Sequence, residues 1–144
     1  MIAVDTNILV YAHRRDSRWH EPAALSLERL SGSKAPWAIP WPCIHEFLAI
    51  VTHPRIYQPA STVDAAIDQV DAWLESPSLL LLNQTESHWA TLRHTLHTGQ
   101  IVGPKIHDAR VAALCLAHGV RELWSADRDF SRFPDLRTTN PLLA

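Results

Sequence analysis

The sequence predicts an α/β protein whose parallel sheet is covered by helices on both faces. Three observations support this fold class. Four short apolar runs, at 2–4, 37–39, 79–82 and 122–125, have the length and composition of strands. Segments with helical periodicity separate each run from the next, which is the pattern of a parallel sheet. The 144 residues amount to one ordinary domain over 1–144, with no internal repeat or linker.

The first half of the chain supplies two strands and three helices. The run 2–4 is followed by polar residues 5–7, and a short helix is expected over 8–13. A second helix is predicted over 20–30, with apolar residues on one face. The strand 37–39 lies between two prolines, and Pro42 suits the first turn of a helix that reaches about residue 52. Its apolar positions recur at i, i+3, i+4 and i+7.

In the second half, a loop at 54–61 precedes a helix over 63–75, for which Ser61 or Thr62 is the expected cap. The unbroken apolar run 79–82 predicts a strand that is covered on both faces. Ser87 is expected to cap a helix that Gly99 ends. The helix at 105–118 is apolar nearly all round, so we expect it to be buried. The strand 122–125, a turn or short helix at 127–133 and a weak strand near 138–139 complete the chain.

Composition bounds the function without identifying it. Net charge is −2 with neutral histidines, so any RNA-binding surface must be local. Cys43 and Cys115 lie within apolar helical patterns and are expected to be buried free thiols rather than a disulfide or zinc ligands. No apolar run approaches the length of a membrane span, and the first strand follows Met1 directly. We therefore expect a soluble cytoplasmic protein with no membrane partner.

Four acidic residues fall where an α/β fold places an active site. Asp5 follows the first strand, Asp127 follows the fourth, and Asp108 lies in the first turn of the buried helix. Ligands of open parallel sheets bind at the carboxyl ends of the strands. Glu46 lies at the edge of an apolar helix face, from which it can reach a cleft. The placement predicts that these four carboxylates converge.

Each acid also has a purely structural interpretation. Asp5 is a suitable cap for the following helix, and Asp108 is favoured by the helix dipole. Glu46 fits a solvated helix edge, and Asp127 fits a turn in which its side chain binds its own backbone. Asp129 shares the turn interpretation, and we weight it towards structure.

Converging carboxylates favour a divalent cation. Two of them about 5 Å apart repel by on the order of 3 kcal/mol at an effective dielectric constant near 20. Without a counter-charge, the pKa of one would rise and it would stay protonated. Mg²⁺ and Mn²⁺ prefer oxygen ligands and retain several waters, and such a site suits phosphodiester hydrolysis.

Four segments resemble the motifs of PIN-domain nucleases. They are I-A-V-D-T-N-I-L-V-Y-A at 2–12, P-C-I-H-E-F at 42–47, I-H-D-A-R-V-A-A-L at 106–114 and S-A-D-R-D-F-S-R-F at 125–133. Their order, their spacing and the chain length are similar to those of VapC toxins, the PIN ribonucleases of bacterial toxin–antitoxin pairs. The resemblance covers nearly the whole chain, although 62–74 matches less well.

The resemblance implies a three-layer α/β/α sandwich with a central, mainly parallel sheet. It also implies an acidic pocket of Asp5, Glu46, Asp108 and Asp127. Asp5 and Asp108 would be the direct Mg²⁺ ligands, with Glu46 and Asp127 as further candidates and Mn²⁺ as a substitute. Ser125 would hold Asp127 or a water, and Asn7 occupies a polar position beside the first acid. A homodimer and a VapB-type antitoxin that reaches into the pocket are the implied partners.

The implied activity is an endoribonuclease in which water attacks the RNA phosphodiester, leaving a 5′-phosphate and a 3′-hydroxyl. Glu46 or Asp127 would orient or deprotonate the water. Basic side chains are candidates for phosphate contacts, and a solvated face or a surface ion pair explains each of them equally well. These candidates are Arg14, Arg15, Arg18, Arg55, Lys105 and Arg110.

Three other functions remain open at this stage. One is a DNase or a structure-specific flap nuclease, although such proteins usually carry extra helical elements that this compact chain lacks. His107-Asp108 is similar to the pair of HD-type phosphohydrolases, with His45, His94 or His97 as further ligands, but that fold is all-helical. A catalytically silent PIN module that binds RNA or a protein is the third alternative, and the presence of all four acids speaks against it. Among the six tryptophans, Trp37, Trp73 and Trp89 fit a core or a dimer contact. Trp19 and Trp41 remain open as surfaces on which bases stack.

Overall fold

The computed structural model describes residues 1–143, whose elements follow the predicted alternation of strands and helices. The strands are β1 (Ile2–Val4), β2 (Trp37–Pro40), β3 (Leu79–Leu82), β4 (Glu122–Trp124) and β5 (Arg137–Thr139). The α-helices are α1 (Thr6–His13), α2 (His20–Gly32), α3 (Trp41–Val51), α4 (Val63–Leu74), α5 (His88–Gly99) and α6 (Ile106–Ala117). Short 3₁₀ turns are η1 (Gly103–Lys105), η2 (Arg128–Arg132) and η3 (Pro141–Leu143).

The five strands form one sheet in the order β3-β2-β1-β4-β5, and every neighbouring pair is parallel. Ile2 of the central strand β1 is in register with Trp37 on one side and Glu122 on the other. The chain builds outward from β1 through β2 and β3, and then crosses to the other side of β1 for β4 and β5. The change of direction between β1 and β4 is the position where open parallel sheets bind ligands.

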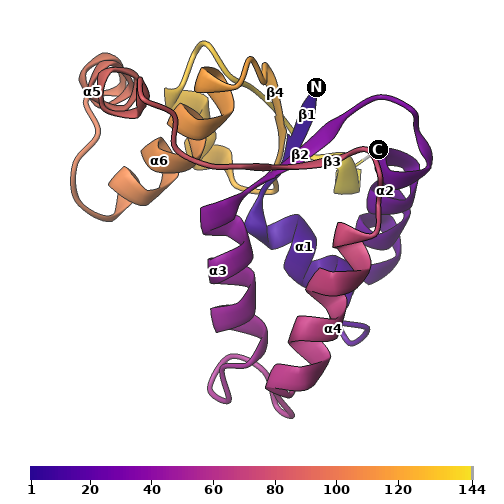
Figure 1. Ribbon diagram of the computed structural model, residues 1–144. Coiled ribbons are helices and arrows are strands. Elements are labelled where there is room, and N and C mark those ends of the chain that lie inside the picture. The colour runs from indigo at the N-terminus through magenta and orange to yellow at the C-terminus, as the bar shows by residue number, and fades with distance from the viewer. Residues whose placement is uncertain (144) are drawn as a thin grey trace.

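Helices cover the sheet on both faces, which confirms the predicted three-layer α/β/α architecture. Figure 1 shows α5 and α6 on one side of the strands and α1, α2 and α4 on the other. Helix α1 packs on both α2 and α3, α3 also packs on α4, and α5 packs on α6. The crossovers from β1 to β2, β2 to β3 and β3 to β4 each carry α-helices, as is usual for parallel strands, whereas the connection from β4 to β5 contains only η2.

The core lies between the sheet and these helices. Val4, Ile39 and Leu123 of the three central strands are buried completely, as is Phe47 of α3. The ring of Phe47 packs edge-on against Trp73 of α4, with the ring centroids 4.8 Å apart. The predicted burial of α6 is confirmed from Ala109 to Cys115, where only Arg110 is partly exposed, and Cys43 and Cys115 are buried free thiols as expected. Among residues 1–143, we find no helix with both the length and the apolar character of a membrane span.

The prediction that β3 is covered on both faces is wrong. The side chain of Leu80 is 48% exposed, and those of Leu79 and Leu81 are only partly buried. The physical reason is that β3 lies at the edge of the sheet and pairs only with β2. An unbroken apolar run is typical of a covered strand, but it does not reveal that the strand is at an edge.

Two expected helix signals act differently from the prediction. Ser87 precedes α5 but makes no capping hydrogen bond, and its hydroxyl instead lies 2.9 Å from Oγ1 of Thr85. Gly99 is the last residue of α5, and the left-handed position belongs to Gln100, with φ 49°. A Cβ at Gly99 would lie 3.1 Å from the carbonyl oxygen of Arg132, so close packing explains this glycine. Thr62 caps α4 as expected.

Candidate active site

The four predicted acids lie at the carboxyl edge of the sheet. Asp5 directly follows β1, and Asp127 follows β4, the neighbouring strand. Asp108 comes from the first turn of α6, and Glu46 comes from the second turn of α3. Residues that are up to about 120 positions apart in the sequence therefore contribute to one region, because adjacent parallel strands end at the same edge.

Asp5 is the buried centre of this region, with an exposed fraction of 7%. Its Oδ1 accepts a hydrogen bond from the backbone N–H of Thr6 at 2.8 Å, so Asp5 also caps α1. The Sγ of Cys43 donates to the same oxygen at 3.6 Å. Burial raises the pKa of Asp5 above its usual value, and hydrogen bonds from Ser125 and Thr6 oppose that rise. The capping interpretation is therefore correct, and it coexists with a place in the acidic region.

Ser125 and Asn7 connect Asp5 to the segment after β4. The Ser125 hydroxyl donates to Oδ2 of Asp5 at 2.7 Å and accepts from the backbone N–H of Asp127 at 3.0 Å. The Asn7 amide donates to the same Asp5 oxygen at 3.3 Å and to the Ser125 hydroxyl at 3.2 Å. Its carbonyl oxygen accepts from the N–H of Ala126 at 3.0 Å. These bonds fix the first acid relative to the loop that carries the fourth.

Asp129, which the sequence analysis weighted towards structure, joins the acidic region. One carboxylate oxygen from each of Asp108, Asp127 and Asp129 lies within 4.8 Å of the others. Asp127 also accepts a hydrogen bond from the backbone N–H of Asp129 at 2.8 Å, as its turn interpretation predicted. Lys105 pairs with Asp129 at 3.2 Å. The spacing D-x-D at 127–129 was the available signal, because a turn that brings one carboxylate into the region brings the next with it.

The electrostatics of Asp108 show that the acids act on one another. Its pKa is raised from 3.8 to about 6. Burial is the largest cause, and the negative charges of other carboxylates add to it because each disfavours a further negative charge nearby. In decreasing order of effect, these neighbours are Asp127, Asp5, Asp129 and Glu46. All four predicted acids and Asp129 therefore share one electrostatic environment.

Glu46 forms the outer wall of this region. Its side chain is exposed, and Oε2 accepts a hydrogen bond from the hydroxyl of Thr6 at 3.2 Å. Thr6 is therefore a residue that the sequence analysis missed, because nothing in the sequence pairs positions 6 and 46. Glu46 and Asp108 also line a pocket of about 520 Å³ between α3 and α6, together with His45, His107 and Arg110.

These donors fit a hard divalent cation. The region offers carboxylate oxygens from five acidic side chains, and oxygen ligands are those that Mg²⁺ and Mn²⁺ prefer. The pKa of Asp108, raised first by burial and then by the neighbouring carboxylates, agrees with this fit, because a cation would neutralise the negative charge of those neighbours. Among residues 1–143, Lys105 is the only cationic side chain that forms an ion pair with one of these acids.

The predicted phosphate-contact residues occupy different environments. Arg14 forms an ion pair with Asp16 at 2.6 Å and lies over the ring of Tyr57, so its guanidinium is already engaged. Arg15 is exposed. Lys105 and Arg110 lie at the acidic region, and the buried Nε of Arg110 makes no hydrogen bond to any of residues 1–143.

The histidines do not assemble the alternative site. The HD-type interpretation requires an all-helical fold, whereas this chain has a five-stranded parallel sheet. His107 is exposed at the start of α6. Among the described residues, the group of potential metal ligands contains only aspartates.

Comparison with known proteins identifies relatives over nearly the whole chain. The model of the PIN domain family matches residues 2–136. Ribonuclease VapC43 of Mycobacterium tuberculosis H37Rv is 37% identical over 142 residues, which cover 99% of this chain and 96% of that protein. Ribonuclease VapC31 of the same strain is 32% identical over 143 residues, covering 99% of this chain and all of that protein.

Solved structures share the fold. VapBC2 from Rickettsia felis, solved with a DNA fragment from its promoter, gives a TM-score of 0.67 at 22% identity. The match covers 97% of this chain and 98% of that one. VapC20 of Mycobacterium tuberculosis, a toxin that cleaves the sarcin–ricin loop, gives a TM-score of 0.66 at 21% identity, covering 95% and 99% of the two chains.

Proposed function

The chain belongs to the PIN-domain family, in its VapC branch, and from this premise we propose that it is an Mg²⁺-dependent endoribonuclease, the toxin of a toxin–antitoxin pair. The observation that carries the proposal is the mutual influence of the acids on Asp108, whose pKa they help to raise to about 6. A protein that only bound a partner would have no need for repelling carboxylates in one half-buried region. The names of its relatives, ribonucleases VapC43 and VapC31, support the substrate class.

Asp5 and Asp108 are the proposed Mg²⁺ ligands, with Asp127 and Glu46 as further ones, and Mn²⁺ would substitute. Each oxygen of Asp5 already accepts two hydrogen bonds, so a cation would replace one of the two longest, the 3.6 Å bond from Cys43 or the 3.3 Å bond from Asn7. Asp129 is an additional candidate because its oxygen lies within 4.8 Å of those of Asp108 and Asp127. When bound, the cation would activate water and neutralise charge on the phosphodiester.

The side chains of this chain would then perform three tasks. Glu46 or Asp127 would orient the attacking water and accept its proton. Ser125 and Asn7 would hold Asp5 in place through their hydrogen bonds to its Oδ2. Lys105 or Arg110 would contact a phosphate of the RNA. Attack by water on the phosphodiester predicts products with a 5′-phosphate and a 3′-hydroxyl, and an RNA substrate would place this activity in the cytoplasm.

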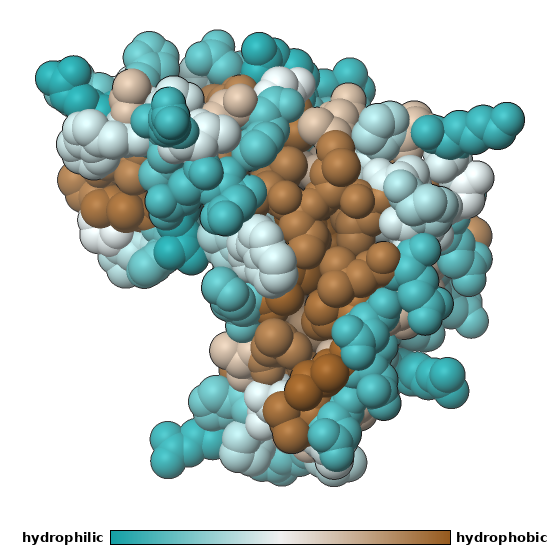
Figure 2. All heavy atoms as spheres, in the orientation of Figure 1, coloured by the Kyte–Doolittle hydropathy of each residue, from teal (hydrophilic) through white to brown (hydrophobic). Residues whose placement is uncertain are grey.

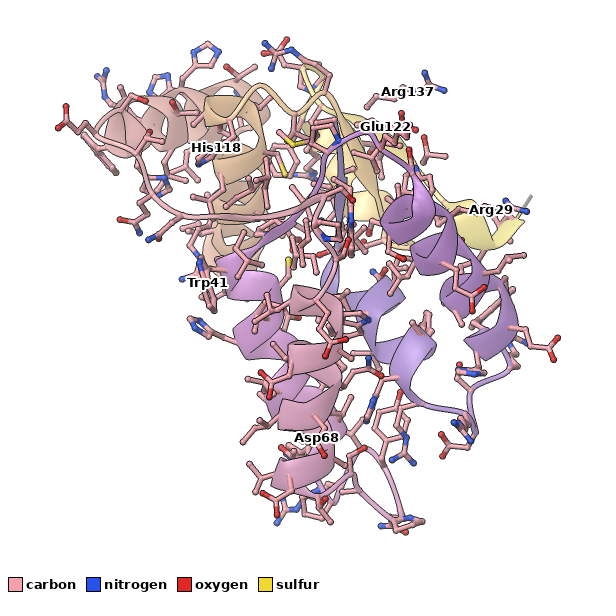
Figure 3. All side chains as sticks on the ribbon, turned by 45° about the vertical axis from the view of Figure 1, so that its right-hand side comes forward. Arg29, Trp41, Asp68, His118, Glu122 and Arg137 are labelled. Carbon is pink, nitrogen blue, oxygen red and sulfur yellow. The ribbon has the colours of Figure 1, made fainter. Side chains whose placement is uncertain are left out.

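The test is cleavage of total cellular RNA by purified protein without antitoxin, with Mg²⁺ and with sequencing of the cut ends. Asp5→Asn and addition of EDTA should each abolish discrete cleavage. Asp68→Asn is the matched control, because this exposed acid on α4 undergoes the same chemical change outside the acidic region (Figure 3). Products ending in 2′,3′-cyclic phosphate would refute the hydrolytic mechanism. Absence of cleavage by folded, Mg²⁺-binding protein would favour the silent module instead.

A protein partner is the second part of the proposal. Figure 2 shows a continuous apolar band over α4 and β3. Its most exposed members are Val63, Ile67 and Leu74 on one face of α4, and Leu80 on β3, each 44–62% exposed. Monomers rarely leave such a contiguous apolar surface uncovered. A second copy of this chain and a VapB-type antitoxin are the proposed partners, and the solved VapBC2 complex supports the antitoxin.

Ile67→Glu distinguishes the two partners. Val102→Glu is the control, since Val102 is 76% exposed and lies outside the band. If a second copy covers the band, Ile67→Glu should convert dimer to monomer in light scattering, while Val102→Glu stays dimeric. If the antitoxin covers it, Ile67→Glu should escape inhibition without a change in mass. No effect of Ile67→Glu on either property would refute the assignment of this surface.

A further inference from the structure

The pocket between α3 and α6 adjoins the acidic region, but basic and aromatic side chains also line it. Glu46 and Asp108 belong to both the pocket and the acidic region. The remaining polar lining is cationic or aromatic: His45, His107 and Arg110. Figure 2 shows the molecule hollowed between the part formed by α5 and α6 and the part that contains α3. A ligand that lies on the acids would therefore continue into this hollow.

An aromatic pair adjoins the pocket, because His45 lines it and Trp41 lies one helical turn away. Trp41 and His45 are four residues apart on α3 and so lie on the same face of the helix. Their ring centroids are 6.0 Å apart with an interplanar angle of 34°. Trp41 is partly exposed and His45 is exposed, and Figure 3 shows Trp41 at the start of α3, beside α6. Glu46 follows His45 directly, so the pair adjoins the acidic wall.

The features of this pocket match a nucleotide. Aromatic faces bind unpaired bases of any sequence by stacking. Arg110 lines the pocket, and a guanidinium is a suitable donor for a phosphate or a base edge. The volume of about 520 Å³ falls within the range of pockets that hold small ligands. Trp19, the other open candidate, is less suited because Arg18 already lies 4.7 Å over its ring.

We propose that Trp41 and His45 form a platform on which one unpaired base stacks, adjacent to the phosphodiester held at the acidic region. Arg110 contacts the same nucleotide. The platform rests on the proposed function for RNA as its ligand. It makes Trp41 a residue for binding and positioning, because the ring contacts a base and not the reacting phosphate.

The test measures binding, so that it is independent of cleavage. The Asp5→Asn protein with Mg²⁺ is titrated into two labelled probes, oligoadenylate of ten residues and an abasic ribose-phosphate chain of the same length. Both probes carry the same phosphates, so the ratio of their Kd values isolates the contribution of the bases. Stacking of one base predicts about a 10-fold preference for oligoadenylate.

Three further variants in the same background assign that preference. Trp41→Leu keeps an apolar side chain against the core but removes the aromatic face, and it should reduce the ratio to about 1–2. Trp41→Phe should restore most of the preference. Trp89→Leu, at a position that is 66% exposed on α5, should retain all of it. Thermal melts establish that each variant is folded.

Two outcomes would overturn the platform: an unchanged ratio in Trp41→Leu, which includes equal weakening of both probes, or no binding of oligoadenylate by the folded protein. The proposed function fails separately. If the wild-type protein cleaves RNA but the ratio of Kd values does not depend on Trp41, only the platform is refuted. If the ratio of Kd values depends on Trp41 but the wild-type protein cleaves no RNA, the platform is retained and the nuclease activity is refuted.

Discussion

Replacing Asp108 with asparagine should stabilise the metal-free protein at neutral pH. The pKa of Asp108 is raised from 3.8 to about 6, so the folded state disfavours its ionised form. At about 1.36 kcal/mol per pKa unit, the full penalty is about 3 kcal/mol. Asp108 is partly exposed, and screening by solvent reduces this to about 1–2 kcal/mol. Loss of a favourable charge in the first turn of α6 offsets about 0.5 kcal/mol. A net gain of about 1 kcal/mol remains.

The dependence on pH follows from the sign of the shift. Because the pKa is higher in the folded state, stability is greatest below the unfolded value near 3.8 and falls as pH rises towards about 6. The advantage of Asp108→Asn should therefore be complete at pH 7.5 and nearly absent at pH 4. Mg²⁺ should remove it at pH 7.5 by stabilising the wild type through differential binding to the folded state.

The assay is thermal unfolding followed by circular dichroism, in EDTA at pH 7.5 and pH 4. For a domain of this size, about 1 kcal/mol corresponds to a rise in Tm of about 2–4 °C. Asp68→Asn is again the matched control, because it removes one negative charge outside the acidic region and should change Tm by less than about 1 °C. If Asp108→Asn is no more stable than either the wild type or this control at pH 7.5, Asp108 does not carry the penalty from burial and neighbouring carboxylates that the structure indicates.

Three further predictions concern the supports of the site and the core. Ser125→Ala should destabilise the protein by about 1–3 kcal/mol in denaturant unfolding, because Asp5 is buried and loses its 2.7 Å donor, and unchanged stability would show that the bond is dispensable. Cys43 and Cys115 are buried, with pKa values raised by burial, so a thiol reagent should react with neither in native protein and with both in guanidinium chloride. Fast native reaction would contradict their burial. Phe47→Ala should cost about 3–5 kcal/mol, and a loss below about 1 kcal/mol would contradict its packing against Trp73.

The order and type of the elements could be read from the sequence because they depend on local patterns. The apolar run 2–4 that stops at Asp5 and the period of apolar residues after Pro42 each act within a few residues. The burial of α6 also followed from its composition, since a helix that is apolar nearly all round must be covered. The predicted boundaries consequently agree with the structure to within about two residues.

The sequence alone therefore determined a parallel α/β fold and four acids at strand ends and helix faces. Only the tertiary structure decided that Asp129 joins these acids, that Thr6 bonds Glu46, and that the apolar strand β3 is an exposed edge. The bond between Thr6 and Glu46 and the edge position of β3 depend on which distant segments lie side by side, so no local pattern encodes them. For Asp129 the only local signal is the D-x-D spacing at 127–129. The raised pKa of Asp108 also depends on the folded chain, because burial and the neighbouring carboxylates that cause it arise only on folding.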